Sequence, residues 1–172
     1  MEPNARVLFV CLGNICRSPL AEAIFAAQVR AAGVDHLFQA DSAGTGRWHV
    51  GDTADPRTLD VAERRGVHVA SIARQVRRQD YERFDLILAM DQSNLAELHS
   101  QCPPSHQHKL KLMREYDVPR HRGADVPDPY WGGADGFERL FDLLDMCCRN
   151  LLDSLTSDLE ASAPDPPEPD RE

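Results

Sequence analysis

Blocks of apolar and polar residues alternate along the chain, and they predict β-strands separated by α-helices. Short, almost continuous apolar runs are typical of strands that a sheet buries on both faces. Such runs lie at residues 7–11, 37–40, 84–91 and 110–113. Apolar residues that recur every three or four positions predict amphipathic helices. This spacing occurs at residues 19–33, 55–66, 94–99 and 137–155, and a short helical turn is expected near Asp80.

The alternation of strands and helices predicts a single α/β domain, built as a three-layer α/β/α sandwich around a four-stranded parallel sheet. Ligands in such folds bind beyond the carboxyl ends of the strands. Three polar segments follow predicted strands: the loop after Cys11, a loop of turn-forming residues at 41–46, and the turn at Asp91. We therefore expect one crevice to gather these three segments.

Two segments lie outside this alternation. Residues 114–136 contain three prolines and four glycines, which predicts a long loop, and loops of that length usually carry function. The C-terminal residues 157–172 are strongly acidic, and residues 161–172 combine several prolines with no large apolar side chain, which predicts disorder. The sequence thus indicates a domain at residues 1–156 and a disordered tail at residues 157–172.

The net charge of −9 is concentrated in that tail, so the body of the chain is only mildly acidic. Lysine and arginine form no long basic block beyond residues 74–78, so nucleic acid is not an expected partner. No apolar run approaches the ~18 residues of a membrane-spanning helix. The N-terminus lacks the basic region of a secretory signal. We expect a cytoplasmic monomer that does not bind membranes.

The five cysteines are expected to be free thiols. Their odd number, without a secretory signal, argues against a disulfide framework, and their spacings match no zinc site. No metal or cofactor is therefore expected. Cys147 and Cys148 fall on the predicted final helix, where packing is the expected role, and Cys102 has no assigned role. The cysteines of interest are those in the loop after the first strand.

This loop has the composition of an oxyanion cradle. It runs from a strand end to a helix start as Cys11-Leu12-Gly13-Asn14-Ile15-Cys16-Arg17-Ser18-Pro19. Backbone N–H groups and a helix N-terminus can lower a thiol pKa from ~8.5 to ~3.5–7.5, and Arg17 offers a planar fork for two phosphate oxygens. Gly13 and Asn14 tolerate the positive φ that inward-pointing amides require. A buried structural cysteine is the plainer interpretation of Cys11 alone, but the complete motif favours a nucleophile.

The same loop resembles the active-site loop of the low-molecular-weight protein tyrosine phosphatases. Further segments resemble that family in the same order, over residues 6 to about 155: Ser42-Ala43-Gly44-Thr45, Trp48-His49-Val50-Gly51, Asp55-Pro56-Arg57, Ala73-Arg74-Gln75, Met90-Asp91 and Asp128-Pro129-Tyr130. The resemblance implies the phosphotyrosine phosphatase I-like fold. It also implies hydrolysis of aryl phosphate monoesters in tyrosine-phosphorylated proteins or peptides, with inhibition by phosphate-like oxyanions.

The resemblance further implies a role for each matching residue. Cys11 would form a phosphocysteine, Arg17 and the loop amides would bind the phosphate oxygens, and Asp128 would act as general acid and then general base. Ser18 would hydrogen-bond the thiolate, and Asn14 would brace the loop together with a serine from the second strand region. The implied phosphate-binding and loop-supporting residues are Leu12, Gly13, Asn14, Ile15, Cys16, Ser18 and Ser42. These roles require no metal.

Aromatic residues near these motifs predict the walls of a slot for a phenyl phosphate. Trp48 and Tyr130 are expected to form the walls, whereas Trp131 is equally compatible with a wall and with a cap on the core. Asp91 is equally compatible with ending a strand and with supporting the crevice. Three polar residues are expected at the surface and outside the chemistry: His49, His68 and Arg74.

Cys16 is a candidate redox partner of Cys11. A neighbouring thiol can trap an oxidised cysteine as a disulfide before irreversible oxidation. The resemblance to family members with paired cysteines implies such reversible protection here.

Three other functions stay open from the sequence. Protein-arginine phosphatases are similar but carry threonine at the position of Ile15, whose apolar side chain suits an aromatic ring better than a guanidinium. Thioredoxin-coupled arsenate reductases add a resolving cysteine pair in a mobile segment, whereas Cys102 stands alone and Cys147-Cys148 are adjacent in a helix. A non-catalytic phosphate-binding module would not need nucleophile, arginine and acid together.

Overall fold

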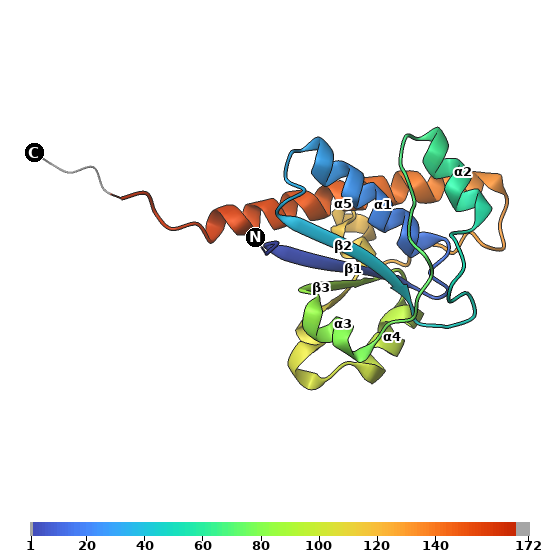
Figure 1. The fold of residues 1–172 in the computed structure, drawn as a ribbon, viewed down its shortest axis with the longest axis horizontal. Helices are drawn as coiled ribbons and strands as arrows, with labels where there is room; N and C mark the ends of the chain where they lie inside the picture. The colour runs from blue at the N-terminus through green and yellow to red at the C-terminus, as the bar shows by residue number, and fades with distance from the viewer. Residues whose placement is uncertain (1, 168–172) are drawn as a thin grey trace, which may run out of the picture.

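The computed structural model describes residues 2–167 and is built around a four-stranded parallel sheet (Figure 1). The strands are β1 (Ala5–Cys11), β2 (Phe38–Gly44), β3 (Leu86–Ala89) and β4 (Leu110–Leu112). They lie in the order β2-β1-β3-β4, and every neighbouring pair is parallel. The predicted fold class is confirmed.

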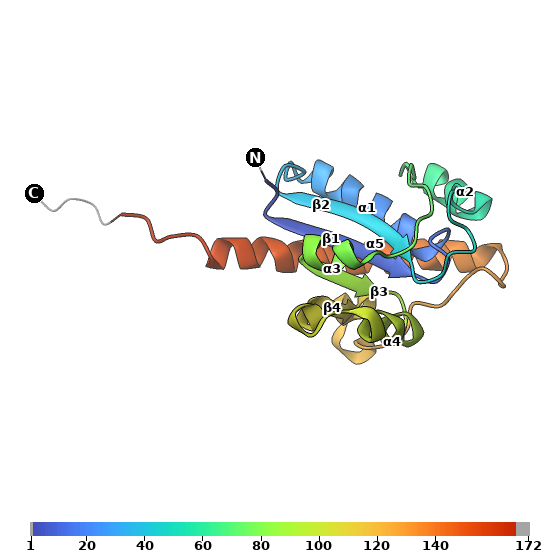
Figure 2. The ribbon, with the colours of Figure 1, turned by 60° about the horizontal axis from the view of Figure 1, so that its bottom comes forward.

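Helices cover both faces of the sheet (Figures 1 and 2). One face carries α1 (Arg17–Ala31), α2 (Pro56–Arg64) and α5 (Ala134–Ala161). The other face carries α3 (Arg78–Arg83) and α4 (Gln92–Gln101). Three short 3-10 helices complete the fold: η1 (Pro104–Lys109), η2 (Met113–Tyr116) and η3 (Pro119–His121). Within residues 2–167, no helix is long and apolar enough to cross a membrane.

The central strand β1 divides two hydrophobic cores, which explains its continuous apolar sequence. Val7 and Phe9 point into the core under α1 and α5, whereas Leu8 and Val10 point into the core under α3 and α4. All four side chains are fully buried. Because each such burial contributes about 1.5–3 kcal/mol, both faces of β1 stabilise the sheet.

The order of the strands brings the predicted crevice together at the carboxyl end of β1. The chain passes from β1 to β2 on one side and reaches β3 on the other, so β1 and β3 enclose the point where the strand order reverses, and ligands bind at such points. Cys11 pairs with Gly44, and Val10 pairs with Ala89, which is followed by Met90 and then Asp91. The three polar segments predicted to meet are therefore neighbours.

Several element boundaries differ from those predicted. β2 continues to Gly44, because residues 41–44 pair in register with residues 8–11 of β1 although their types favour turns. The prediction of a helical turn near Asp80 is confirmed by α3. The long segment 114–136 contains η2 and η3 besides the start of α5.

The last helix runs further than its apolar spacing predicts. α5 ends at Ala161, so the expected boundary at residue 156 falls inside a helix. Hydrophobic Leu155 and Leu159 pack against the core, which extends the helix into the acidic segment. Part of the expected tail, residues 168–172, lies outside the described residues, and its disorder stays a prediction.

Candidate active site

The loop between β1 and α1 is held by the side chain of Asn14. Asn14 has a φ of 56°, and no other non-glycine residue in the described chain has a positive φ. Its Nδ2 donates to Ser18 Oγ at 2.8 Å and to Ser42 Oγ at 3.0 Å. Its Oδ1 accepts a hydrogen bond from the backbone N–H of Arg74 at 3.0 Å. One buried amide therefore ties the strained residue to α1, to β2 and to the segment before α3.

Two glycines near this loop are required for space. Gly13 does not have the positive φ that its type permits, but a Cβ there would lie 3.0 Å from Cδ2 of His49. A Cβ at Gly46 would overlap the ring of Trp48, at 2.0 Å from Cζ3. The imidazole and indole rings thus lie directly over backbone that lacks side chains, which brings both rings to the loop.

The sulfur of Cys11 lies at the centre of this loop. Cys11 is buried, with 3% of its surface exposed. Its Sγ lies 3.0 Å from Ser18 Oγ and accepts a hydrogen bond from the Asn14 backbone N–H at 3.3 Å. A hydroxyl group and a backbone N–H within hydrogen-bond distance of one sulfur are partners that can stabilise a thiolate.

The guanidinium of Arg17 is fixed beside that sulfur. Its Nη1 donates to Asp91 Oδ2 at 2.8 Å and to the Val126 carbonyl at 2.9 Å, and its side chain is 3% exposed. Burial opposes the charge, but the negative charges of Cys11, Asp91 and Asp128 raise the pKa of Arg17 above its ordinary value. Asp91 also caps α4 by accepting from the Asn94 N–H, so it both ends the strand segment and orients the arginine.

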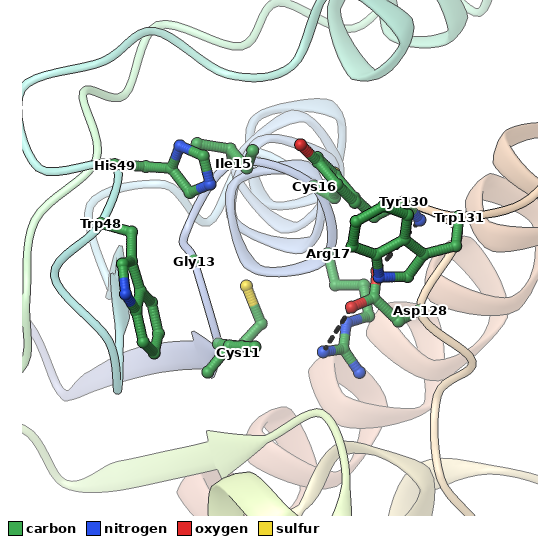
Figure 3. A pocket seen from close by; sticks show the side chains of 11 residues that line it. Cys11, Gly13, Ile15, Cys16, Arg17, Trp48, His49, Asp128, Tyr130 and Trp131 are labelled. Atoms are coloured by element: carbon green, nitrogen blue, oxygen red, sulfur yellow. Dashed lines mark hydrogen bonds and ion pairs between the residues drawn. The ribbon is translucent and has the colours of Figure 1, made fainter.

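The long loop before α5 brings Asp128 to the same place. Asp128 Oδ2 lies 3.6 Å from Arg17 Nη2, and 38% of the Asp128 side chain is exposed. Asp128 Oδ1 accepts a hydrogen bond from the Tyr130 N–H at 3.1 Å, which fixes the carboxyl group on its own loop. Figure 3 shows this carboxyl group facing the cavity above Arg17.

These groups line one cavity of 240 Å³. Trp48 and Tyr130 lie on opposite sides of the Cys11 sulfur (Figure 3). Trp131 also lines the cavity, packs edge-on against Tyr130 with ring centroids 4.8 Å apart, and is 89% exposed. The floor is polar and the walls are aromatic, so the cavity fits an oxyanion attached to a flat apolar group.

Cys16 faces the same cavity with a different chemical character. Burial, followed by the nearby charges of Asp55 and Cys11, raises the pKa of the Cys16 thiol to about 12. Cys16 is therefore protonated at neutral pH. Cys147 and Cys148 are fully buried in the core under α1 and α5, as expected for packing residues, and all five cysteines are free.

Two of the three residues expected at the polar surface contribute to the site. His49 lines the cavity. Arg74 is part-buried and pairs with Asp80 at 2.9 Å and Asp41 at 3.0 Å, while its backbone holds Asn14. His68 is exposed, as expected. In the sequence, only the position of Arg74 and His49 inside family-like motifs pointed to a role for them. The loop residues that they contact are distant along the chain, so local patterns could not reveal these contacts.

Sequence reasoning also gave no role to Asp55 and Arg57. They form a bidentate ion pair at the start of α2, with Arg57 Nη2 2.9 Å from Asp55 Oδ2. The hydrogen bonds of Asp55 with its neighbour hold the pKa of its carboxyl below the usual range. The pair lies between the loop of Cys11 and the loop of Asp128.

Comparison with known proteins agrees with this geometry. The family model for "Low molecular weight phosphotyrosine protein phosphatase" matches residues 6–161. A low molecular weight protein-tyrosine-phosphatase of Streptomyces coelicolor is 45% identical over 160 residues, covering 92% of this chain and 98% of that protein. A low molecular weight phosphotyrosine protein phosphatase of Schizosaccharomyces pombe is 46% identical over 156 residues, covering 90% and 99%.

A solved structure is similar over the whole domain. The crystal structure of a protein tyrosine phosphatase from Entamoeba histolytica, with Hepes in the active site, superposes with a TM-score of 0.86 and 41% identity. The match covers 90% of this chain and 99% of that chain. The family match ends where α5 ends, and the resemblance seen in the motifs is confirmed. The chain belongs to the low molecular weight phosphotyrosine protein phosphatase family.

Proposed function

We propose that the protein hydrolyses phosphotyrosine and related aryl phosphate monoesters through a phosphocysteine on Cys11. The observation that carries the proposal is the convergence of a buried sulfur, a fixed guanidinium and a carboxyl group on one cavity. The family relationship supports the same reaction class.

In the first step, the Cys11 thiolate attacks phosphorus and the bond from phosphorus to the phenolic oxygen breaks. Asp128, protonated at the start, donates its proton to the departing oxygen. Arg17 and the loop amides bind the equatorial oxygens as their charge develops, and losing one such donor typically costs ~3–4 kcal/mol of transition-state stabilisation. The Asp128 position beside Arg17 supports this assignment.

In the second step, water attacks the phosphorus of the phosphocysteine. Asp128, now ionised, takes a proton from that water, and the sulfur–phosphorus bond breaks to release inorganic phosphate and regenerate the thiolate. Ser18 supports the leaving thiolate, because its hydroxyl lies 3.0 Å from the sulfur. Neither step uses a metal or a cofactor.

The preference for aryl phosphates is assigned to the walls of the cavity. Trp48 and Tyr130 flank the Cys11 sulfur, and Ile15 contributes an apolar edge (Figure 3). A phenyl ring can stack between aromatic walls, whereas a phosphoserine side chain is shorter and has no ring to stack. The apolar Ile15 favours a phenyl ring over the guanidinium of phosphoarginine.

The proposal also covers the substrates, the inhibitors, the location and the redox protection of the protein. The substrates are tyrosine-phosphorylated proteins or peptides, and phosphate-like oxyanions compete for the cradle. The protein acts as a cytoplasmic monomer, and Cys16 protects Cys11 from irreversible oxidation. The shared cavity of the two thiols supports the last point.

The test compares the natural chain with Cys11→Ser and a matched control, Cys102→Ser, which removes a buried thiol outside the cavity. We expect Cys11→Ser to lose turnover of phosphotyrosine peptides but to keep vanadate binding, and Cys102→Ser to keep both. Substantial turnover by Cys11→Ser would contradict the covalent route. Faster turnover of phosphoarginine or phosphoserine peptides, or arsenate reduction, would contradict the substrate assignment.

A second variant tests the acid. Asp128→Ala is expected to lower kcat by ~10²–10⁴-fold for a phenolic leaving group. An unchanged rate would place the acid elsewhere.

A further inference from the structure

Arg57 has one edge occupied by an acid from its own helix start. Its Nε donates to Asp55 Oδ1 at 3.0 Å and its Nη2 donates to Asp55 Oδ2 at 2.9 Å. Asp55 also caps α2 by accepting from the Arg57 backbone N–H at 2.8 Å, and its side chain is 8% exposed. Because a bidentate pair fixes the plane of both groups, the direction of the third nitrogen, Nη1, is set by Asp55.

That third nitrogen reaches the loop of Asp128. Arg57 Nη1 donates to the carbonyl oxygen of Tyr130 at 3.1 Å. Cζ of Arg57 lies 5.4 Å from the centroid of the Tyr130 ring and 4.8 Å from that of Phe137, at the start of α5. Arg57 therefore contacts the backbone and the ring of the residue whose N–H binds the Asp128 carboxylate.

Few other hydrogen bonds attach this loop to the rest of the molecule, although Pro129 is buried and Tyr130 packs against the core. Within the described chain, the remaining hydrogen bonds of residues 127–132 stay inside the loop, from Tyr130 N to Asp128 and from Gly132 N to Pro129. The bond from Arg57 is the one that ties these residues to another segment. The contact of Asp128 with Arg17, at 3.6 Å, is longer and is the contact that a substrate phosphate would disturb.

The same pair is anchored to the loop between β1 and α1, called here the phosphate loop (residues 11–18) after its proposed role. The backbone N–H of Asp55 donates to the carbonyl of Ile15 at 2.9 Å. A continuous path of direct contacts thus runs from Ile15 through Asp55 and Arg57 to Tyr130 and Asp128. It links the loop that holds the nucleophile to the loop that holds the acid.

We propose that Arg57 is a positioning residue that sets the distance and orientation of the Asp128 carboxyl relative to the phosphate loop. The inference rests on the proposed role of Asp128 as general acid. Arg57 touches neither the substrate nor the reacting atoms in this proposal. Its effect is geometric, since a misplaced acid can lower a rate strongly without altering how the phosphate is bound.

The experiment measures kcat/KM with a series of aryl phosphates that differ in the basicity of the leaving phenolate. This ratio reports the step that releases the phenolate and not the second step, in which Asp128 acts as the base for every substrate. Poor leaving groups need the proton from Asp128, whereas a dinitrophenolate leaves without it. Arg57→Ala is expected to lower kcat/KM about 10–100-fold for phenyl phosphate, less than the ~10²–10⁴-fold that complete loss of general acid catalysis costs. For dinitrophenyl phosphate the change should be below about threefold, and inhibition by inorganic phosphate should be unchanged.

Two variants separate positioning from a general loss of structure. Arg57→Lys keeps the charge but cannot hold Asp55 in a bidentate pair while reaching Tyr130. It should therefore lose activity in the same pattern as Arg57→Ala, more for phenyl phosphate than for dinitrophenyl phosphate, but by a smaller factor. Arg65→Ala is the matched control, because Arg65 also joins the α2 end to α5, through Glu138, Asp142 and the Phe141 ring, but contacts no part of the loop of Asp128. The kinetics of Arg65→Ala should match those of the natural chain for every leaving group.

Asp128→Ala and the double variant Asp128→Ala/Arg57→Ala complete the design. If Arg57 acts through Asp128, its loss adds less than about twofold in the Asp128→Ala background, since residues acting as one unit are not additive. Equal loss across all leaving groups, or full additivity, would overturn the inference. If Asp128→Ala loses the same factor in rate for every leaving group, Asp128 is not the general acid. That outcome can be told apart from a correct acid with a wrong role for Arg57.

Discussion

Asn14 and Ser42 lie 28 positions apart in the chain, and their side chains meet at 3.0 Å behind the loop of Cys11. Both are buried, with 2% and 1% of their surfaces exposed. The bond joins the one positive-φ residue of the loop to β2, so the strain of the loop is supported by the sheet.

Removing this support is expected to weaken catalysis. Ser42→Ala deletes one hydrogen bond, worth about 1 kcal/mol net, while Ser18 continues to accept from Asn14. We expect kcat/KM for a phosphotyrosine peptide to fall about fivefold, since 1.36 kcal/mol corresponds to a factor of ten. Ser93→Ala, at an exposed position of α4, is the control and should keep natural kinetics. Natural kinetics for Ser42→Ala would contradict a bracing role.

Trp48 and Trp131 should differ in their effect on substrate binding. Trp48 lies across the sulfur from Tyr130 (Figure 3), whereas Trp131 packs edge-on against Tyr130 and is 89% exposed. An aromatic contact is worth ~0.5–1.5 kcal/mol beyond its area, so Trp48→Ala should raise KM for phosphotyrosine peptides about five- to tenfold. Trp131→Ala should raise it less. Inhibition by inorganic phosphate, which has no ring, should be the same in both variants, and a changed phosphate affinity would place Trp48 in the anion site instead.

The ionisation of Glu22 should make the stability of the folded protein depend on pH. This residue of α1 has a part-buried side chain whose Oε1 has no hydrogen-bond partner among residues 2–167. Burial, with Asp41 adding to it and Ser42 and Arg74 opposing it, raises the pKa of Glu22 to about 7. The folded state therefore binds this proton more tightly than the unfolded chain. The resulting stabilisation is complete below pH ~4.3 and is lost as the pH rises to about 7.

Glu22→Gln removes that ionisation. The difference in the free energy of unfolding between Glu22→Gln and the natural chain, measured by urea titration, should shift in favour of the variant by about 3 kcal/mol between pH 4 and 8. Glu63→Gln, at an exposed position of α2, should follow the natural chain at every pH. A difference between Glu22→Gln and the natural chain that is constant with pH would contradict the prediction.

Mild peroxide should produce a disulfide between Cys11 and Cys16. The two side chains line one cavity and both are free thiols. Because a neighbouring thiol can condense with a sulfenic acid, mass spectrometry should detect the Cys11–Cys16 disulfide. An activity assay should show that dithiothreitol restores turnover. Cys16→Ser should instead accumulate the sulfinic acid and lose activity irreversibly. Accumulation of Cys11 sulfinic acid in the natural chain would rule out protection.

The sequence predicted the parts of the molecule that local patterns control. Residues buried on both faces must be apolar, so β1 could be recognised from 7–11 alone, and the motif at Cys11 indicated where the candidate site lies. Residues 41–44 were expected to form a loop, because small polar residues favour turns, yet pairing with β1 makes them a strand. Long-range pairing overrides such local preferences.

The contacts of single side chains could not be predicted in the same way. Gly13 was expected to need a positive φ, and its actual constraint is the ring of His49, 36 positions later. Arg57 stands in a recognisable motif, but its partner Tyr130 is separated from it by 73 positions. No periodicity or composition connects such residues, so their roles became visible only when the fold brought them together.

The length and direction of α5 have a practical consequence. With 28 residues, the helix is about 42 Å long, and it begins beside the loop of Asp128 and ends at the opposite end of the molecule (Figure 1). A tag, surface linker or fluorophore attached after Ala161 would therefore stay remote from the mouth of the pocket. Immobilisation through the C-terminus should leave the enzyme open to large phosphoprotein ligands in a sensor experiment.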